Sequence, residues 1–149
     1  MPNATLIDAG PLIAALNPRD HDHARCVAFL RGFTGSFVTT WPVITEASHM
    51  LSANIDSQIA LLKWIERGGL NVQHVEIEAV RQMILYTKKY RDRPMDLADA
   101  SLVALATQMD LSEIASIDSD FEIYKLPNNT RLKNQLAGEP QLGRKKSKR

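Results

Sequence analysis

The sequence contains the run Met95-Asp96-Leu97-Ala98-Asp99-Ala100-Ser101-Leu102-Val103-Ala104-Leu105-Ala106, an apolar helical stretch with two carboxylates near its start. A helix that is so rich in Leu, Val and Ala is buried on most of its faces. Aspartate is rarely buried unless it is paired or binds a metal ion. The stretch therefore predicts a central, buried helix whose carboxylates have a specific task.

The two acids of this run differ in their expected roles. Pro94 breaks the chain just before it, so Asp96 fits the N-cap position and Asp99 the third helical position of a pair that resembles a capping box. Capping alone can explain Asp96. Asp99 shares a helical face with Val103 and Ala106, and burying it without a partner would cost free energy. We therefore expect Asp99 to have a function beyond capping.

The composition is that of an ordinary globular domain. The chain has 149 residues, of which 44% are apolar and 23% charged, and this fits one domain, expected over residues 1–135. The single cysteine, Cys26, excludes an internal disulfide and favours a reducing compartment. No signal-peptide pattern and no apolar run of about 18 residues is present. The sequence therefore predicts a cytoplasmic protein.

The charge is distributed unevenly along the chain. The formal net charge is +1, but five of the 18 basic residues lie within residues 144–149, and without them 13 basic residues face 17 acidic ones, a formal charge of −4. We expect residues 136–149 to form a loose basic tail. This tail is either simply solvated or a flexible arm that attracts phosphate backbones in a salt-dependent way.

Short apolar strands alternate with helical segments along the chain. The predicted strands cover residues 4–7, 37–39, 70–75 and 114–117. Helical segments are expected to start at Leu12, Asp20, Trp41, Asp56 and Glu76. No internal repeat is present. This order predicts a three-layer α/β/α domain with a central, largely parallel sheet of four to five strands, the last of them an edge strand after residue 121.

Acidic residues follow two of these strands. Asp8 ends the first strand and Asp118 ends the strand at 114–117. The carboxyl ends of parallel strands meet at one edge of a sheet, where open α/β folds bind their ligands. Asp8 could instead only cap the next helix, and Asp120 could cap the turn that follows. Glu46 lies at the margin of an apolar helical stripe, where it could point either to solvent or toward Asp8.

Four acids can reach this edge of the predicted sheet: Asp8, Glu46, Asp99 and Asp118. Unpaired carboxylates at close range repel one another, so such a cluster is stable only when cations neutralise it. Neither a cysteine nor a convincing histidine belongs to the set. Oxygen donors of this kind suit a hard ion such as Mg²⁺ or Mn²⁺ rather than Zn²⁺, and this predicts phosphate chemistry.

Four short segments occur in the order known from one protein family. They are Ile7-Asp8-Ala9-Gly10-Pro11-Leu12, Pro42-Val43-Ile44-Thr45-Glu46-Ala47, Asp96-Leu97-Ala98-Asp99-Ala100-Ser101-Leu102 and Ser116-Ile117-Asp118-Ser119-Asp120-Phe121. Each segment is weak evidence alone, but the ordered set, which spans residues 6–121, is more specific. It resembles the PIN-domain ribonucleases, especially the VapC-like toxins of prokaryotic toxin–antitoxin modules.

The resemblance implies two sets of site residues. The metal-binding and catalytic acids would be Asp8, Glu46, Asp99 and Asp118. The auxiliary residues would be Asp96, Asp120 and Ser116, where Ser116 stands in place of the Thr of many members. The implied protein is a Mg²⁺- or Mn²⁺-dependent endoribonuclease in which the metal activates a water molecule to hydrolyse an RNA phosphodiester. Its implied partners are accessible single-stranded RNA, a small antitoxin protein and a second copy of the chain.

Three other functions fit parts of the pattern. One is a PIN ribonuclease that processes RNA without being a toxin. Another is a catalytically silent PIN-like module that binds RNA or protein, but this would predict a broken acid set, and here the set is intact. The third is a phosphotransfer domain that accepts phosphate on Asp8, as receivers and haloacid-dehalogenase-like phosphatases do. Gly10 argues against the phosphatases, which usually have a second Asp at this position.

Overall fold

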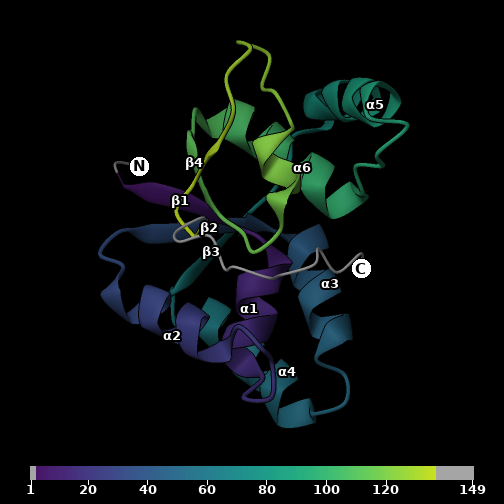
Figure 1. The fold of residues 1–149 in the computed structure, drawn as a ribbon. Coiled ribbons are helices and arrows are strands. Elements are labelled where there is room, and N and C mark those ends of the chain that lie inside the picture. Colours follow the sequence, from purple (N-terminus) through teal and green to yellow (C-terminus); the bar gives the residue numbers. More distant parts are fainter. Residues whose placement is uncertain (1–2, 137–149) are drawn as a thin grey trace.

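A computed structural model describes residues 3–136 of the chain. Its centre is a five-stranded, all-parallel sheet with the strand order β3-β2-β1-β4-β5. The strands are β1 (Ala4–Ile7), β2 (Ser36–Thr40), β3 (Leu70–Gln73), β4 (Glu113–Ala115) and β5 (Lys133–Asn134). Helices cover both faces of the sheet (Figure 1), as the predicted α/β/α domain requires. The predicted tail, apart from Leu136, lies outside the described residues.

Six α-helices and two short 3₁₀ turns are described in residues 3–136. They are α1 (Ala9–Leu16), α2 (His23–Gly32), α3 (Trp41–Met50), α4 (Ile55–Glu66), η1 (Ile77–Ala79), α5 (Val80–Lys89), α6 (Leu97–Met109) and η2 (Ser119–Glu122). In Figure 1, α1, α2 and α4 lie below the sheet and α5 and α6 above it. Helix α3 contacts both α1 and α6. Within residues 3–136, no helix has the length and apolar character needed to cross a membrane.

The central position of the strand β1 explains its composition. It pairs with β2 on one side and β4 on the other, and all of its residues are buried. A strand that is covered on both faces is mostly apolar, because neither row of its side chains meets water. The one polar residue of β1, Thr5, donates to the Glu113 carboxylate over 3.4 Å. The Thr39 hydroxyl, from the neighbouring strand, donates to the Ile7 carbonyl oxygen over 2.9 Å. This bond ties the carboxyl ends of β1 and β2 together.

Helix α6 is the buried central helix that the sequence predicts. Every residue from 98 to 106 is buried, including Asp99. The Asp99 backbone N–H donates to the Asp96 side chain over 2.8 Å, which confirms Asp96 as the N-cap. The hydroxyl oxygens of Thr40 and Ser101 lie 2.7 Å apart and join the end of β2 to the first half of α6. These contacts hold the start of α6 at the carboxyl-terminal edge of the sheet.

Several predicted boundaries differ from the structure. Three of them differ by one to three residues, since α1 starts at Ala9 and not Leu12, α4 at Ile55 and not Asp56, and β3 ends at Gln73 and not Val75. Helix α2 begins at His23 instead of Asp20, because the Asp20 side chain accepts from the Asp22 backbone N–H and forms a turn. The segment after Glu76 starts with η1 and becomes α-helical only at Val80. The strand predicted at residues 114–117 extends two residues too far, since β4 ends at Ala115.

The early end of β4 has a local cause. At Ser116 the side chain of Asn134 makes the two hydrogen bonds that the backbone of a neighbouring strand would otherwise make. Its Oδ1 accepts from the Ser116 N–H over 3.1 Å, and its Nδ2 donates to the Ser116 carbonyl oxygen over 2.9 Å. Both backbone groups are satisfied without a longer sheet, so the chain is free to turn toward Asp118.

Candidate functional site

Asp8 follows β1 at the carboxyl-terminal edge of the sheet, and its side chain has two roles. One oxygen, Oδ1, accepts from the Ala9 N–H over 2.8 Å and caps α1. The other, Oδ2, accepts from the Ser116 hydroxyl over 3.1 Å. The residue is only 8% exposed. Asp8 therefore does cap α1, but capping uses only one of its two oxygens. The other oxygen binds Ser116, which follows the end of another strand.

Asp99 is buried in the first turn of α6, 9% exposed, and has an aromatic partner. The Tyr124 hydroxyl donates to its Oδ2 over 3.1 Å. Tyr124 is itself 2% exposed, and a buried tyrosine hydroxyl needs a polar partner. Our sequence analysis did not identify Tyr124 as a site residue. No local pattern marks it, since its partner lies 25 residues away and only the fold brings the two together.

Burial and nearby negative charges make both carboxyls weak acids. Burial raises the pKa of Asp8 to about 7, and the charges of Glu46 and Asp96 add to this, while hydrogen bonds from Ala9 and Ser116 oppose it. Burial also raises the pKa of Asp99 to about 8, with further increases from Asp8 and Asp96 and an opposing hydrogen bond from Tyr124. Two charged carboxylates are therefore unfavourable here unless a cation accompanies them.

The remaining acids surround this buried pair from more exposed positions. Glu46 on α3 and Asp96 before α6 are exposed, and both raise the pKa of Asp8 by their charge. Asp118 is exposed and caps η2 by accepting from the Asp120 N–H over 3.1 Å. The expectation that Asp120 itself caps this turn is therefore wrong. The reason is that the chain already bends at Asp118, which places Asp120 inside the turn.

Asp120 forms an ion pair with a basic residue of the segment before α6. The Arg93 guanidinium donates to its Oδ1 over 3.1 Å. Burial and the charge of Asp118 raise the pKa of Asp120, and Arg93 lowers it. Asp120 in turn raises the pKa of Asp99. Asp120 therefore interacts electrostatically with both the exposed Asp118 and the buried Asp99.

The structure thus brings all the predicted acids into one electrostatic group, which we call the acidic cluster. Its members are Asp8, Glu46, Asp96, Asp99, Asp118 and Asp120. Ser116 contacts it through Asp8. Among residues 3–136, no three Asp, Glu, His or Cys side chains are arranged to hold a metal ion. The donors nevertheless suit a hard divalent cation, because the cluster offers carboxylate oxygens and neither imidazole nor thiolate groups.

Comparison with known proteins supports the same fold. The PIN domain family model matches residues 5–126. One relative is "Ribonuclease VapC26" of Mycobacterium tuberculosis (strain ATCC 25618 / H37Rv), which is 23% identical over 115 residues. That match covers 76% of this chain and 85% of the relative.

Two solved structures resemble this one. The first is Mycobacterium tuberculosis VapC20, described as a sarcin-ricin loop cleaving toxin, with a TM-score of 0.74 and 16% identity over 85% of this chain and 98% of that one. The second is VapBC2 from Rickettsia felis bound to a DNA fragment from their promoter, with a TM-score of 0.59 and 11% identity over 84% of this chain and 94% of that one. At such low identity the likeness is one of fold.

Proposed function

This chain belongs to the PIN domain family, and we propose that it is a metal-dependent endoribonuclease that hydrolyses RNA phosphodiester bonds. PIN domains are typically nucleases, and one relative is a ribonuclease at 23% identity. The observation that carries the proposal is the pair Asp8 and Asp99 at the centre of the acidic cluster. Both carboxyls are buried, and the charge of Asp8 adds to the cost of ionising Asp99. Two such buried carboxyls lower the stability of the metal-free protein, and a bound cation would explain their presence.

The acidic cluster offers the ligands for this cation. Asp8 and Asp99 would hold it from inside the protein, and Glu46 and Asp118 from the solvent side. PIN domains generally bind divalent metal, and carboxylate oxygens favour Mg²⁺ or Mn²⁺. When bound, the ion supplies Lewis-acid activation of the phosphate and of a water molecule.

The residues around the pair have positioning roles in this proposal. Ser116 and Tyr124 each donate a hydrogen bond to one carboxylate, Ser116 to Asp8 and Tyr124 to Asp99. Such bonds orient metal ligands and keep them in their charged form. Asp96 starts α6 and so sets the position of Asp99. Asp120 extends the negative charge toward Arg93.

The proposed substrate is an accessible RNA strand or loop. A carboxylate cluster needs the scissile phosphate to come close to the protein, and the narrow, deep groove of an A-form duplex hides its bases. No side chain has to act as a covalent nucleophile, because water can serve in that role.

We also propose that the enzyme is the toxin of a toxin–antitoxin pair and acts in the cytoplasm as a homodimer. The names of its relatives support this role, and the VapBC2 complex suggests an antitoxin partner. A ribonuclease of RNA processing would share the same chemistry but would need no antitoxin. Expression of the chain in cells distinguishes the two roles. A toxin arrests growth, and the Asp99→Asn variant does not. Co-expression of a partner protein encoded beside the toxin gene restores growth.

The activity is tested with the purified chain and labelled RNA, in Mg²⁺ or Mn²⁺ and in chelator. Asp99→Asn is the test variant. Asp110→Asn is its matched control, because it makes the same change at the other end of α6, where the left-handed backbone (φ 53°) suits Asn. We expect metal-dependent cleavage by the wild type and the control only. Cleavage in chelator, or full activity of Asp99→Asn, would exclude the proposed site.

A further inference from the structure

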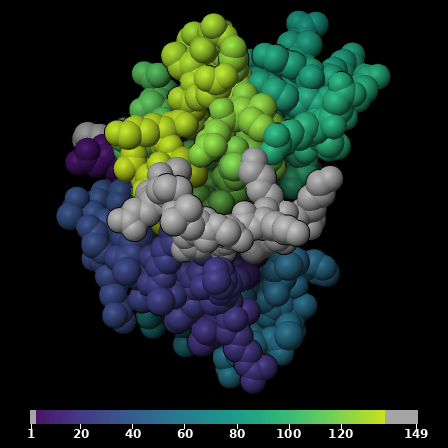
Figure 2. All heavy atoms as spheres, viewed as in Figure 1, coloured from purple at the N-terminus to yellow at the C-terminus, as the bar shows by residue number. Residues whose placement is uncertain are grey.

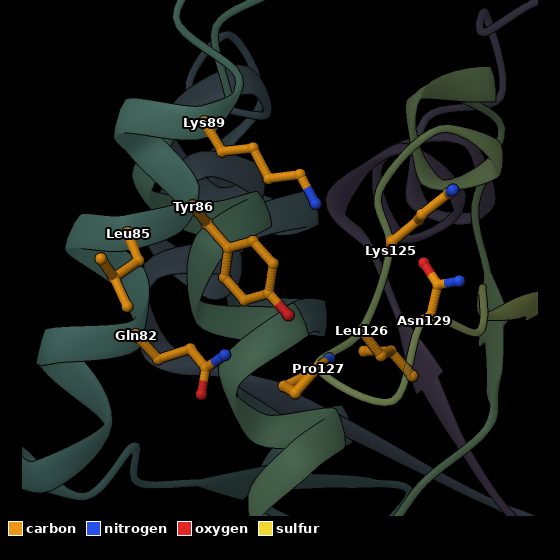
Figure 3. A pocket seen from close by; sticks show the side chains of 8 residues that line it. All are labelled: Gln82, Leu85, Tyr86, Lys89, Lys125, Leu126, Pro127 and Asn129. Carbon is orange, nitrogen blue, oxygen red and sulfur yellow. The ribbon is translucent and has the colours of Figure 1, made fainter.

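A recess lies between α5 and residues 125–129 (Figure 3). In the space-filling view, the yellow-green segment that contains residues 125–129 stands next to teal α5 at one end of the molecule (Figure 2). The segment is held in a tight turn, since the Leu126 N–H donates to the Thr130 carbonyl oxygen over 2.8 Å and Lys125 forms a β-bridge with Arg131. One wall of the recess is a helix and the other an ordered turn.

Tyr86 brings a buried, unsatisfied hydroxyl to the wall of this recess. The residue is 5% exposed, and its hydroxyl oxygen is buried with no hydrogen-bond partner among residues 3–136. Burial raises the pKa of Tyr86 and the nearby Gln82 side chain opposes this, but no group in the described part of the chain meets full hydrogen-bond geometry with the hydroxyl. Figure 3 shows the hydroxyl directed from α5 toward the opposite wall. Buried polar groups without partners are rare in folded proteins, and each calls for an explanation such as a missing ligand.

The other lining groups combine apolar, amide and cationic chemistry. Leu85 and Pro127 supply apolar surface, and Asn129 adds an amide. Lys89 and Lys125 bring two ammonium groups, and in Figure 3 the Lys89 side chain extends from α5 toward the opposite wall. A nucleotide needs this combination, because its base has apolar faces and hydrogen-bonding edges and its phosphate is anionic.

The volume of the recess limits what can occupy it. It encloses about 240 Å³, less than the roughly 300–1,000 Å³ of sites that enclose a whole small molecule. The recess can therefore enclose only a small group, such as one unit of a longer ligand. The basic end of α5, which continues from Lys88 and Lys89 to Arg91, favours a polyanionic ligand.

Three tyrosines with neighbouring rings connect the recess with the acidic cluster. The ring of Tyr86 lies 6.3 Å from that of Tyr90, and the ring of Tyr90 lies 5.0 Å from that of Tyr124. The Tyr124 hydroxyl then bonds to Asp99, and the Tyr90 hydroxyl accepts from the Lys125 N–H over 2.9 Å. Tyr86 in the recess is thus connected to Asp99 in the acidic cluster through two ring contacts and one hydrogen bond.

We propose that this recess binds one nucleotide of the RNA strand that is cleaved at the acidic cluster. The base lies against Leu85 and Pro127 with its polar edge on the Tyr86 hydroxyl, and the phosphate lies near Lys89 and Lys125. This assignment rests on the proposed function, because it takes the ligand to be RNA.

The test measures binding without cleavage, in chelator, by fluorescence anisotropy of a labelled single-stranded RNA of mixed sequence. The RNA is about 12 nucleotides long, within the usual site sizes of single-strand binders. Tyr86→Phe removes only the hydroxyl, and we expect it to weaken binding roughly 3- to 10-fold. Lys89→Gln should weaken binding similarly and lower the salt dependence by about 0.7 in the log–log slope, the value for one phosphate of a single strand.

Two further variants complete the design. Asn129→Gly removes the amide but keeps the positive φ of 66°, which glycine adopts without strain, so it should weaken binding while the protein stays folded. Lys63→Gln on α4, across the sheet, makes the same charge change as Lys89→Gln outside the recess and should leave binding unchanged. Thermal melts of all four variants report on folding.

The outcomes separate this inference from the proposed function. If the wild type cleaves RNA but Tyr86→Phe, Lys89→Gln and Asn129→Gly bind as the wild type does, the nucleotide site is wrong and the nuclease assignment stands. If these variants weaken binding but no RNA is ever cleaved, the site stands without the activity. If they change the oligomeric state and not the RNA affinity, the recess is a protein contact and the nucleotide assignment is overturned.

Discussion

The Tyr124 hydroxyl donates a hydrogen bond to Oδ2 of Asp99 over 3.1 Å, and this joins the chain after η2 to the first turn of α6. It supplies the partner that a carboxyl in such an apolar helix requires. The ring of Tyr124 also packs edge-on against Phe121 and Tyr90, at centroid distances of 5.4 and 5.0 Å. The orientation of Asp99 is therefore set by an aromatic cluster that is distant in sequence.

The first prediction concerns this bond. Tyr124→Phe keeps the ring but removes the donor, so it should lower the free energy of unfolding by about 1–3 kcal/mol at pH 8 and weaken Mg²⁺ binding about 10-fold or more. Urea denaturation and a Mg²⁺ titration measure the two effects. The matched control is Tyr86→Phe, whose hydroxyl has no partner within residues 3–136 and whose loss should not destabilise the protein. Equal stability of Tyr124→Phe and Tyr86→Phe would contradict the assigned role.

The second prediction is a decrease in metal-free stability as the pH rises. The folded-state pKa values of Asp8, about 7, and Asp99, about 8, lie above the ordinary value of 3.8. Between pH 4 and pH 8 the folded state therefore holds protons that the unfolded chain has released, so the free energy of unfolding falls as the pH rises. Each unit of pKa difference corresponds to about 1.4 kcal/mol. Denaturation in chelator at pH 5 and pH 8 measures this, and a stability that rises toward pH 8 would argue against the raised pKa values.

The third prediction isolates the contribution of Asp99. Asp99→Asn removes one of the two buried charges, and its amide oxygen can still accept from Tyr124. Without metal, this variant should be more stable than the wild type at pH 8, and the difference should shrink at pH 5, where the wild-type carboxyls are protonated. Asp110→Asn, the control at the other end of α6, should show no such pH-dependent gain. A variant that is less stable than the wild type at pH 8 in chelator would count against repulsion within the pair.

The fourth prediction concerns the effect of metal on the wild type. A divalent ion that binds only the folded state raises the melting temperature, and it must displace the protons held by Asp8 and Asp99. We expect Mg²⁺ or Mn²⁺ to stabilise the wild type strongly at pH 8 and weakly at pH 5, with proton release detectable by calorimetry in buffers of different ionisation enthalpy. Stabilisation of Asp99→Asn to the same extent would place the ion elsewhere.

Local patterns predicted much of the fold and the identity of the acids. The positions of β1, β2, α3 and α6 follow from short apolar runs, turn residues and caps, which depend on near neighbours in sequence. The distinction between Asp96 as a cap and Asp99 as a buried acid follows from helical spacing and holds in the structure. Two of the boundaries that failed, at Asp20 and after Ala115, lie where a side chain replaces a backbone hydrogen bond.

The sequence by itself determined that this chain is an α/β domain and which acids could meet at the edge of its sheet, because strand and helix periodicity and the ends of parallel strands are local properties. Only the tertiary structure decided what surrounds these acids. The bonds of Ser116 to Asp8 and of Tyr124 to Asp99, and the unsatisfied hydroxyl of Tyr86, arise where segments distant in sequence pack together. No local pattern encodes such contacts, because each depends on the position of both partners in the folded chain.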